Sequence, residues 1–210
     1  MKCILFDWDG VLADSLTHYF ELYQAVSRHF QKPLPIHSPQ EFREWYEPRW
    51  EENYYEMGFS AEELPAALEW AINWLDYSRV QLFAPVPAML RRLAAEWPMA
   101  IVSTTPSPII RQRLAKEGLE ELFRLVTGGE DGSSEKVEKI DLTLARLGLR
   151  HGVMVGDTRL DVEAAAHHGL KTVAATYGWQ SPARVLAARP DLTAERPEEL
   201  EAVVRQALGV

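Results

Sequence analysis

Hydrophobic residues follow two different patterns along the chain. Short unbroken hydrophobic runs have the length of buried strands, whereas longer segments repeat hydrophobic positions every three or four residues, as amphipathic helices do. The expected strands cover residues 2–6, 99–102, 125–127, 153–155 and 172–175. The expected helices cover about 86–96, 107–117, 136–147, 159–168 and 197–208. This alternation predicts an α/β fold in which helices cover both faces of a parallel sheet.

The alternation stops between residues 15 and 83, where the pattern is helical throughout. Three helices are expected there, at about 15–31, 39–56 and 60–80. Four of the seven tryptophans lie in this segment, and such aromatic density indicates the small core of a helical insert or, less often, a substrate surface. We therefore expect residues 1–14 and 84–210 to form a core domain, with residues 15–83 as an inserted helical domain.

Composition and charge narrow the range of partners. The net charge of −9 argues against nucleic acid and anionic membranes, which both bind basic surfaces, but it permits a small anionic ligand at a local cation. No hydrophobic run approaches the roughly 18 residues of a membrane span, and the first residues lack the long apolar region of a signal peptide. Cys3 is the single cysteine, which excludes a disulfide within the chain and fits a reducing cytoplasm, the compartment we expect, or a protein that is indifferent to its compartment.

Two carboxylates, Asp7 and Asp9, follow the first expected strand. In a continuing strand, side chains two residues apart share a face, so these acids would repel each other without a cation or a shared proton. A solvated turn that ends at Gly10 is the alternative interpretation.

A hydroxyl and a lysine follow the next two expected strands. Ser103 can donate a hydrogen bond to a phosphate oxygen from its strand end, although it can also cap the helix that follows unless Thr105 or Ser107 does so. Lys136 begins an expected helix, where its charge opposes the helix dipole, and Lys139 is the competing lysine.

The fourth expected strand ends in Gly156-Asp157, and Asp161 follows four residues later. Asp157 and Asp161 can act as hard oxygen ligands for Mg²⁺, or they can be a helix cap and a surface acid. Because ligands bind at the carboxyl ends of parallel strands, all these side chains are expected at one edge of the sheet. Four carboxylates, one hydroxyl and one lysine there are suited to phosphoryl transfer.

The chain resembles the haloacid dehalogenase-like hydrolase superfamily, in particular its phosphoglycolate-phosphatase-like branch with a helical cap. Residues 6–15, Phe-Asp-Trp-Asp-Gly-Val-Leu-Ala-Asp-Ser, are similar to the first family motif, and residues 156–165 are similar to the fourth. The shorter hydroxyl and lysine motifs occur between them in the expected order. The resemblance implies a Rossmann-like three-layer α/β/α sandwich, with residues 15–83 as its cap.

The resemblance also implies a role for each matching residue. Asp7 would be the nucleophile and a metal ligand. Asp9 would be the general acid and base, and its backbone carbonyl would bind the metal. Ser103 and the backbone of Thr104 would hold the phosphate. Lys136 would neutralise the negative charge of the nucleophile and the phosphate. Asp157 would bind Mg²⁺ directly, and Asp161 would support the ion.

The function implied is a magnesium-dependent phosphatase that hydrolyses a small phosphorylated metabolite through an aspartyl-phosphate. Many relatives have Lys-Pro-x-Pro where this chain has Lys136-Val137-Glu138-Lys139, and the distance to the following glycine favours Lys136 over Lys139. A phosphomutase similar to β-phosphoglucomutase and a non-catalytic binding protein on the same scaffold are the alternatives. A dehalogenase is disfavoured because such relatives lack the second acid, which is Asp9 here.

Overall fold

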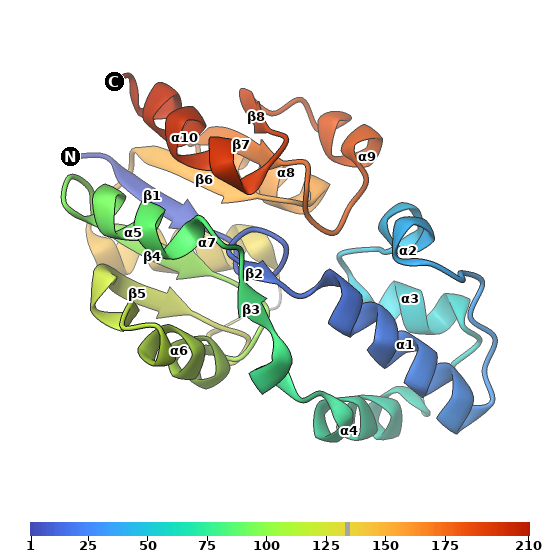
Figure 1. Cartoon of the computed structure of the whole chain (residues 1–210). Coiled ribbons are helices and arrows are strands. Elements are labelled where there is room, and N and C mark those ends of the chain that lie inside the picture. Colours follow the sequence, from blue (N-terminus) through green and yellow to red (C-terminus); the bar gives the residue numbers. More distant parts are fainter. Residues whose placement is uncertain (133–134) are drawn as a thin grey trace. The chain divides into compact units, whose positions relative to one another are not determined.

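The chain forms two compact units in a computed structural model that describes residues 1–132 and 135–210. The first unit comprises Met1–Asp14 together with Leu82–Val210, and the second comprises Ser15–Gln81. The short strands β2 (Ala13–Asp14) and β3 (Gln81–Leu82) pair where the chain passes from one unit to the other (Figure 1).

The first unit is built on a six-stranded sheet in the order β5-β4-β1-β6-β7-β8, and each pair of neighbouring strands is parallel. Its strands are β1 (Cys3–Phe6), β4 (Met99–Val102), β5 (Phe123–Thr127), β6 (Gly152–Gly156), β7 (Lys171–Ala175) and β8 (Leu192–Ala194). All four residues of β1 are buried, as expected for a central strand with helices on both faces. The five strands expected from the sequence are confirmed, whereas β8 was not expected because its three residues form too short a hydrophobic run.

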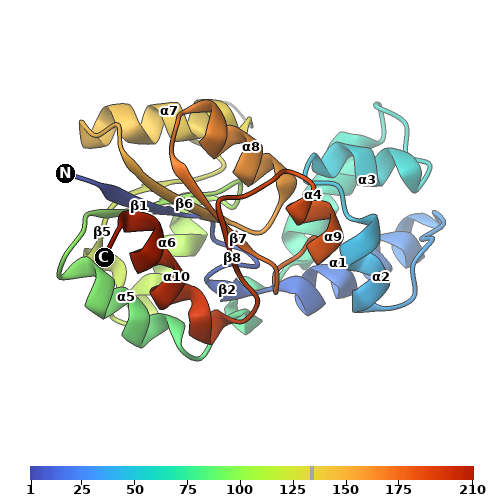
Figure 2. The ribbon, with the colours of Figure 1, turned by 90° about the horizontal axis from the view of Figure 1, so that it is seen from above.

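Helices cover both faces of this sheet. They are α5 (Val86–Ala94), α6 (Ser107–Lys116), α7 (Lys136–Leu147), α8 (Arg159–His167), α9 (Pro182–Leu186) and α10 (Leu200–Leu208), with 3₁₀ turns η2 (Glu120–Leu122) and η3 (Pro197–Glu199). Figure 2 shows α7 and α8 on one face and α5, α6 and α10 on the other, which confirms the predicted three-layer sandwich. Only α9 was not expected, because five residues do not complete two helical turns.

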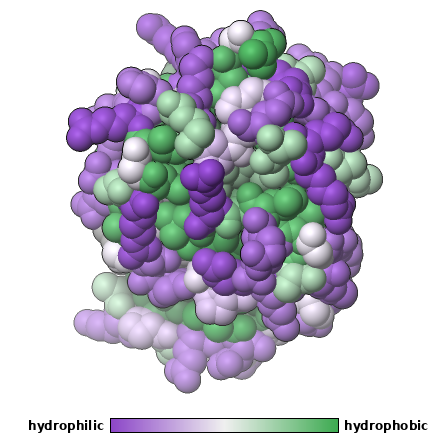
Figure 3. Space-filling model, turned by 90° about the vertical axis from the view of Figure 1, so that its left-hand side faces the viewer, coloured by the Kyte–Doolittle hydropathy of each residue, from purple (hydrophilic) through white to green (hydrophobic). Residues whose placement is uncertain are grey.

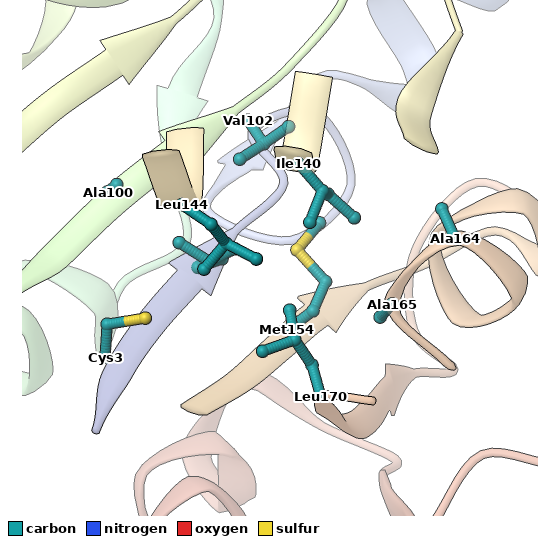
Figure 4. Close-up of a cluster of buried hydrophobic side chains, with 10 residues drawn as sticks. Cys3, Ala100, Val102, Ile140, Leu144, Met154, Ala164, Ala165 and Leu170 are labelled. Atoms are coloured by element: carbon teal, nitrogen blue, oxygen red, sulfur yellow. The ribbon is translucent and has the colours of Figure 1, made fainter. Parts of the chain in front are cut away.

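Hydrophobic side chains fill the layer between the sheet and α7 with α8. Ile140 and Leu144 of α7 and Ala165 of α8 meet Cys3 and Met154 of the sheet (Figure 4). Burial raises the pKa of the Cys3 thiol to about 11, so this residue behaves as a small core side chain rather than as a reactive thiolate.

The second unit is helical. Its elements are α1 (Leu16–Phe30), α2 (Pro39–Trp45), α3 (Trp50–Glu56), α4 (Leu64–Trp74) and the 3₁₀ turn η1 (Tyr77–Arg79). The prediction of a single helix over residues 39–56 was wrong. Pro48 lacks the N–H that a continuous helix requires, and the helical segment is interrupted between α2 and α3. The ring of Tyr23 lies 5.5 Å from that of Phe42 and 5.6 Å from that of Tyr54, and these buried rings form the expected aromatic core.

Charged and polar side chains dominate the surface in Figure 3, and the hydrophobic areas between them are interrupted. Apolar area of this kind is ordinary on a globular protein. Among the helices of the described residues, none has the length and hydrophobicity that crossing a bilayer requires.

Candidate active site

Three neighbouring strands deliver the candidate residues. Asp7 follows β1, Ser103 follows β4 and Asp157 follows β6, and β1 pairs with both β4 and β6. The ladders continue into the site, since the N–H of Asp7 donates to the carbonyl of Val155 at 2.8 Å. The carboxyl ends of adjacent parallel strands thus place these side chains at one edge of the sheet, as the sequence predicts.

A tight turn after β1 brings this segment close to Asp157. The carbonyl of Trp8 accepts hydrogen bonds from the N–H groups of Val11, Leu12 and Ala13, which closes the turn. Gly10 has a φ of 75°, and a Cβ atom there would lie 2.1 Å from an Asp157 carboxylate oxygen. Only glycine permits this conformation and this approach.

Three buried carboxylates converge at this edge. Asp7, Asp157 and Asp161 each offer an oxygen, and these oxygens lie within 4.8 Å of one another. The Nζ atom of Lys136 lies 3.1 Å from Asp7 Oδ1 and 2.8 Å from Asp161 Oδ1, so one cation joins two of the three acids. Lys136 is itself largely buried, with 11% of its side chain exposed.

Asp157 and Asp161 are held by different partners. Asp157 accepts a hydrogen bond from the N–H of Trp179 at 2.5 Å. Asp161 accepts from the N–H and the hydroxyl of Thr158, at 3.1 and 2.7 Å, which makes Thr158 the N-cap of α8 and Asp161 its capping-box partner. The alternative reading of Asp157 as a cap and Asp161 as a surface acid is therefore wrong.

Burial and the neighbouring charges shift the pKa values of these carboxyl groups. Burial raises the pKa of Asp7 to about 7, against the opposing effect of Lys136, and burial with neighbouring negative charge holds the pKa of Asp157 well above its usual range. Burial acts to lower the pKa of Lys136, but Asp161 and Asp7 outweigh it and raise that pKa, so the lysine is charged. Three acids with one lysine lack positive charge, and their hard oxygen atoms fit a divalent cation such as Mg²⁺.

Asp157→Asn is expected to raise the melting temperature of the metal-free protein at about pH 8 by a few degrees, with a smaller rise at about pH 5. The folded-state pKa of Asp157 is raised above the unfolded value of 3.8, so its contribution to stability is complete below that value and is lost as pH rises through the folded-state pKa. The asparagine keeps the shape of the side chain without acquiring the buried charge.

Thermal unfolding in excess chelator at both pH values measures this effect. Asp191→Asn is the matched control, because a hydrogen bond from Lys171 lowers the pKa of Asp191, and its loss should destabilise the protein at about pH 8. A melting temperature of Asp157→Asn at or below that of the parent protein at about pH 8 would contradict the electrostatic account.

Asp9 lies beside this cluster, but its side chain is engaged elsewhere. Its Oδ2 atom accepts a hydrogen bond of 2.5 Å from the hydroxyl of Thr105, which follows β4. The cluster of three carboxylates in the described part of the chain does not include the Asp9 side chain. The first two acids of the chain therefore have different surroundings, and this suits them to different chemical tasks.

The loop after β4 presents a hydroxyl and exposed backbone. Ser103 is buried, and its Oγ atom accepts a hydrogen bond of 3.0 Å from the N–H of Thr105, which leaves its hydrogen for donation. Thr104 is exposed at the turn. Neither Thr105 nor Ser107 caps α6; instead the side chain of Glu130 accepts a hydrogen bond from the N–H of Ser107 at 3.0 Å.

The two candidate lysines point to different places. Lys136 contacts the carboxylates, whereas Lys139 is buried and donates to the backbone carbonyls of Gly128 and Asp131. Burial lowers the pKa of Lys139. The geometry thus brings Lys136, and not Lys139, to the carboxylate cluster.

Sequence reasoning missed two groups of this site. The N–H of Trp179 contacts Asp157, and no sequence signal identifies a backbone donor in a loop. Thr105 contacts Asp9, and it was considered only as a helix cap. Its place two residues after Ser103, in a turn at a strand end, is the signal that would have drawn attention to it.

Comparison with known proteins places the chain within one family. The family model described as haloacid dehalogenase-like hydrolase matches residues 4–175. The phosphoglycolate phosphatase of Pectobacterium atrosepticum is 35% identical over 120 residues, which cover 55% of this chain and 51% of that protein. The chain therefore spans about half the length of this relative.

Two further relatives match along almost the whole chain. The phosphoglycolate phosphatase of Synechococcus elongatus is 29% identical over 212 aligned positions, with 98% of each protein covered. A haloacid dehalogenase-like family hydrolase from Streptococcus pneumoniae has the same fold, with a TM-score of 0.82, 23% identity and coverage of 96% of this chain and 97% of that one.

Proposed function

The chain belongs to the haloacid dehalogenase-like hydrolase family, and we propose that it is a Mg²⁺-dependent phosphatase that hydrolyses a small phosphomonoester through an aspartyl-phosphate on Asp7. The observation that carries this proposal is the ion pair between Lys136 and Asp7, 3.1 Å long, beside the carboxylates of Asp157 and Asp161. A nucleophilic carboxylate needs a cation that keeps it ionised and that also attracts the anionic substrate.

Asp7 and Asp157, together with the backbone carbonyl of Asp9, would hold the Mg²⁺, and Asp161 would support them. When bound, the ion supplies positive charge that offsets the phosphate and the carboxylates. Ser103 and the backbone of Thr104 would bind the phosphate oxygens, and Lys136 would neutralise charge on the nucleophile and the phosphate.

Two half-reactions follow from this arrangement. A carboxylate oxygen of Asp7 attacks phosphorus while Asp9 donates a proton to the departing oxygen, which leaves as an alcohol. Asp9, now a carboxylate, takes a proton from the water that attacks the phosphorus of the aspartyl-phosphate, and this restores Asp7. Each cycle consumes one water molecule and returns both acids to their starting states.

The substrate class is a small phosphorylated metabolite. Relatives named phosphoglycolate phosphatase, one of which aligns with 98% of the chain, make 2-phosphoglycolate the first compound to test. The single cysteine, which is buried, supports the cytoplasm as the compartment in which the protein acts.

Release of phosphate from 4-nitrophenyl phosphate and from a panel of phosphorylated metabolites tests this function. The proposal expects Mg²⁺-dependent release of one phosphate for each alcohol formed. A rearranged phosphorylated product without free phosphate would identify a phosphomutase instead. Tight binding of panel compounds without turnover of any of them would identify a binding protein.

Lys136→Met is expected to lower kcat/KM by at least about 10³-fold, because it removes the cation between the nucleophile and the phosphate. Lys139→Met is the matched control. It leaves the carbonyls of Gly128 and Asp131 without their donor, so it should lower the melting temperature more than Lys136→Met does. Folded Lys139→Met should retain kcat/KM within about tenfold, and the reverse order of activities would assign the site lysine to Lys139.

We further propose that residues 15–83 act as a cap that sets substrate preference. Every proposed catalytic group lies outside this segment, which leaves the core after the Asp7–Asp9 turn and returns before β4. Replacement of residues 17–81 by a short Gly/Ser linker should therefore preserve slow hydrolysis of 4-nitrophenyl phosphate and abolish preference among metabolites. Circular dichroism must first establish that the shortened chain folds, and a folded variant with unchanged preferences would place specificity in the core loops.

A further inference from the structure

Thr105 links two loops that are distant in sequence. The residue is 5% exposed, and its hydroxyl donates to Asp9 Oδ2 at 2.5 Å across a sequence separation of 96 residues. Asp9 follows β1 and Thr105 follows β4, so the bond crosses between neighbouring strand ends. A short hydrogen bond from a buried hydroxyl to a carboxyl group is among the stronger polar contacts in a protein.

The backbone of Thr105 is fixed on both sides. Its N–H donates to Ser103 Oγ at 3.0 Å, and its carbonyl accepts from the N–H of Gly129 at 3.0 Å. Strand β5, which precedes Gly129, pairs with β4, so these bonds anchor the residue to the sheet. The backbone of Thr105 is therefore held by bonds that do not involve Asp9, in a position from which its hydroxyl reaches Asp9 Oδ2.

The Thr105 hydroxyl cannot donate a hydrogen bond to the phosphate while it donates to Asp9. A threonine hydroxyl has one hydrogen, and both a phosphate dianion and the Asp9 carboxyl oxygen need to receive it. Ser103 keeps its own hydrogen for donation, because its Oγ atom acts as the acceptor for the N–H of Thr105. The two hydroxyls of the loop thus face different partners.

We propose that Thr105 is the positioning residue that orients Asp9 as the proton donor to the leaving group, an inference that rests on the phosphatase function proposed above. When Asp9 is protonated, the oxygen that accepts the Thr105 hydrogen bond carries no proton, so the transferable proton resides on Oδ1. As the bond between phosphorus and the leaving oxygen breaks, that proton moves from Oδ1 to the leaving oxygen. Asp9 remains as a carboxylate that later accepts a proton from the attacking water.

If Thr105 has this role, its substitution should lower kcat/KM selectively for substrates with poor leaving groups. Nitrophenolate departs without a proton, whereas an alkoxide must be protonated as it leaves. Benzyl phosphate and 4-nitrophenyl phosphate carry similar rings, so they separate acid catalysis from binding. Because kcat/KM reports only steps up to departure of the leaving group, it is unaffected by the later attack of water.

Thr105→Val, which keeps the shape of threonine without the hydroxyl, should lower kcat/KM for benzyl phosphate by roughly 10- to 100-fold and for 4-nitrophenyl phosphate by less than about threefold. Thr105→Ser should restore the ratio of the two constants to within about threefold of the parent value. Thr193→Val, at the exposed middle position of β8, is the matched control and should leave both constants unchanged. Thr105→Ala provides the same measurement if the valine variant does not fold.

Equal losses for both substrates in Thr105→Val would overturn the inference and assign Thr105 to packing or to phosphate binding. Unchanged constants for both substrates would overturn it as well, since Asp9 would then be oriented without Thr105. Failure of the parent protein to release phosphate from either substrate with Mg²⁺ would refute the phosphatase function itself, a result distinct from both of these.

Discussion

Asp7→Asn should reduce kcat/KM for every substrate by at least about 10⁴-fold and should abolish the phosphoenzyme. The amide oxygen is a poor nucleophile, and the substitution also removes one of the two carboxylates that contact Lys136. The side chain keeps its size and can still accept the hydrogen bond from the N–H of Trp8, which is 2.7 Å long in the parent protein. Loss of activity should therefore occur in a folded protein.

Steady-state kinetics with 4-nitrophenyl phosphate, together with thermal unfolding, measure this loss. Asp141→Asn is the matched control, because Asp141 is exposed on α7 and makes no part of the proposed site. Near-normal turnover by Asp7→Asn would contradict a covalent step on Asp7.

Removal of Mg²⁺ is expected to reduce activity by at least about 10³-fold, and added Mg²⁺ should restore it. Lys136 alone would otherwise face three carboxylates and a phosphate dianion, and this excess of buried negative charge opposes substrate binding. Titration of the chelated enzyme with Mg²⁺, followed by phosphate release, measures the requirement.

Asp157→Asn supplies the matched comparison for the metal. It should raise the Mg²⁺ concentration required for half-maximal activity, because it removes one of the direct ligands and leaves Asp7 in place. Full turnover in excess chelator, with no metal detectable in the protein by elemental analysis, would contradict the proposed chemistry.

The fold could be predicted because its elements have strong local signals. The hydrophobic run of β1 ends abruptly at Asp7, and the helix over 136–147 ends at Gly148, which has a φ of 65° and closes α7. Local signals fail where an element is short or where one residue breaks a longer pattern. Strand β8 and helix α9 illustrate the first case, and Pro48 between α2 and α3 illustrates the second.

The site could be predicted only as far as strand ends determine it. Asp7, Ser103 and Asp157 were placed together because parallel strands share an edge. The choice between Lys136 and Lys139 depends on the direction of two side chains on one helix, and the spacing of these residues does not settle which of them faces the carboxylates. The bond between Thr105 and Asp9 joins positions 96 residues apart, so no local pattern contains it.

Chemical trapping of the phosphoenzyme tests the central claim most directly. The enzyme would be mixed with substrate and Mg²⁺, quenched in acid, treated with borohydride and digested for mass spectrometry. Borohydride reduces an acyl phosphate to an alcohol, so the account predicts homoserine at position 7 in the parent protein and its absence in Asp7→Asn. Turnover without modification of Asp7, or modification at another carboxylate such as Asp9 or Asp157, would contradict the account.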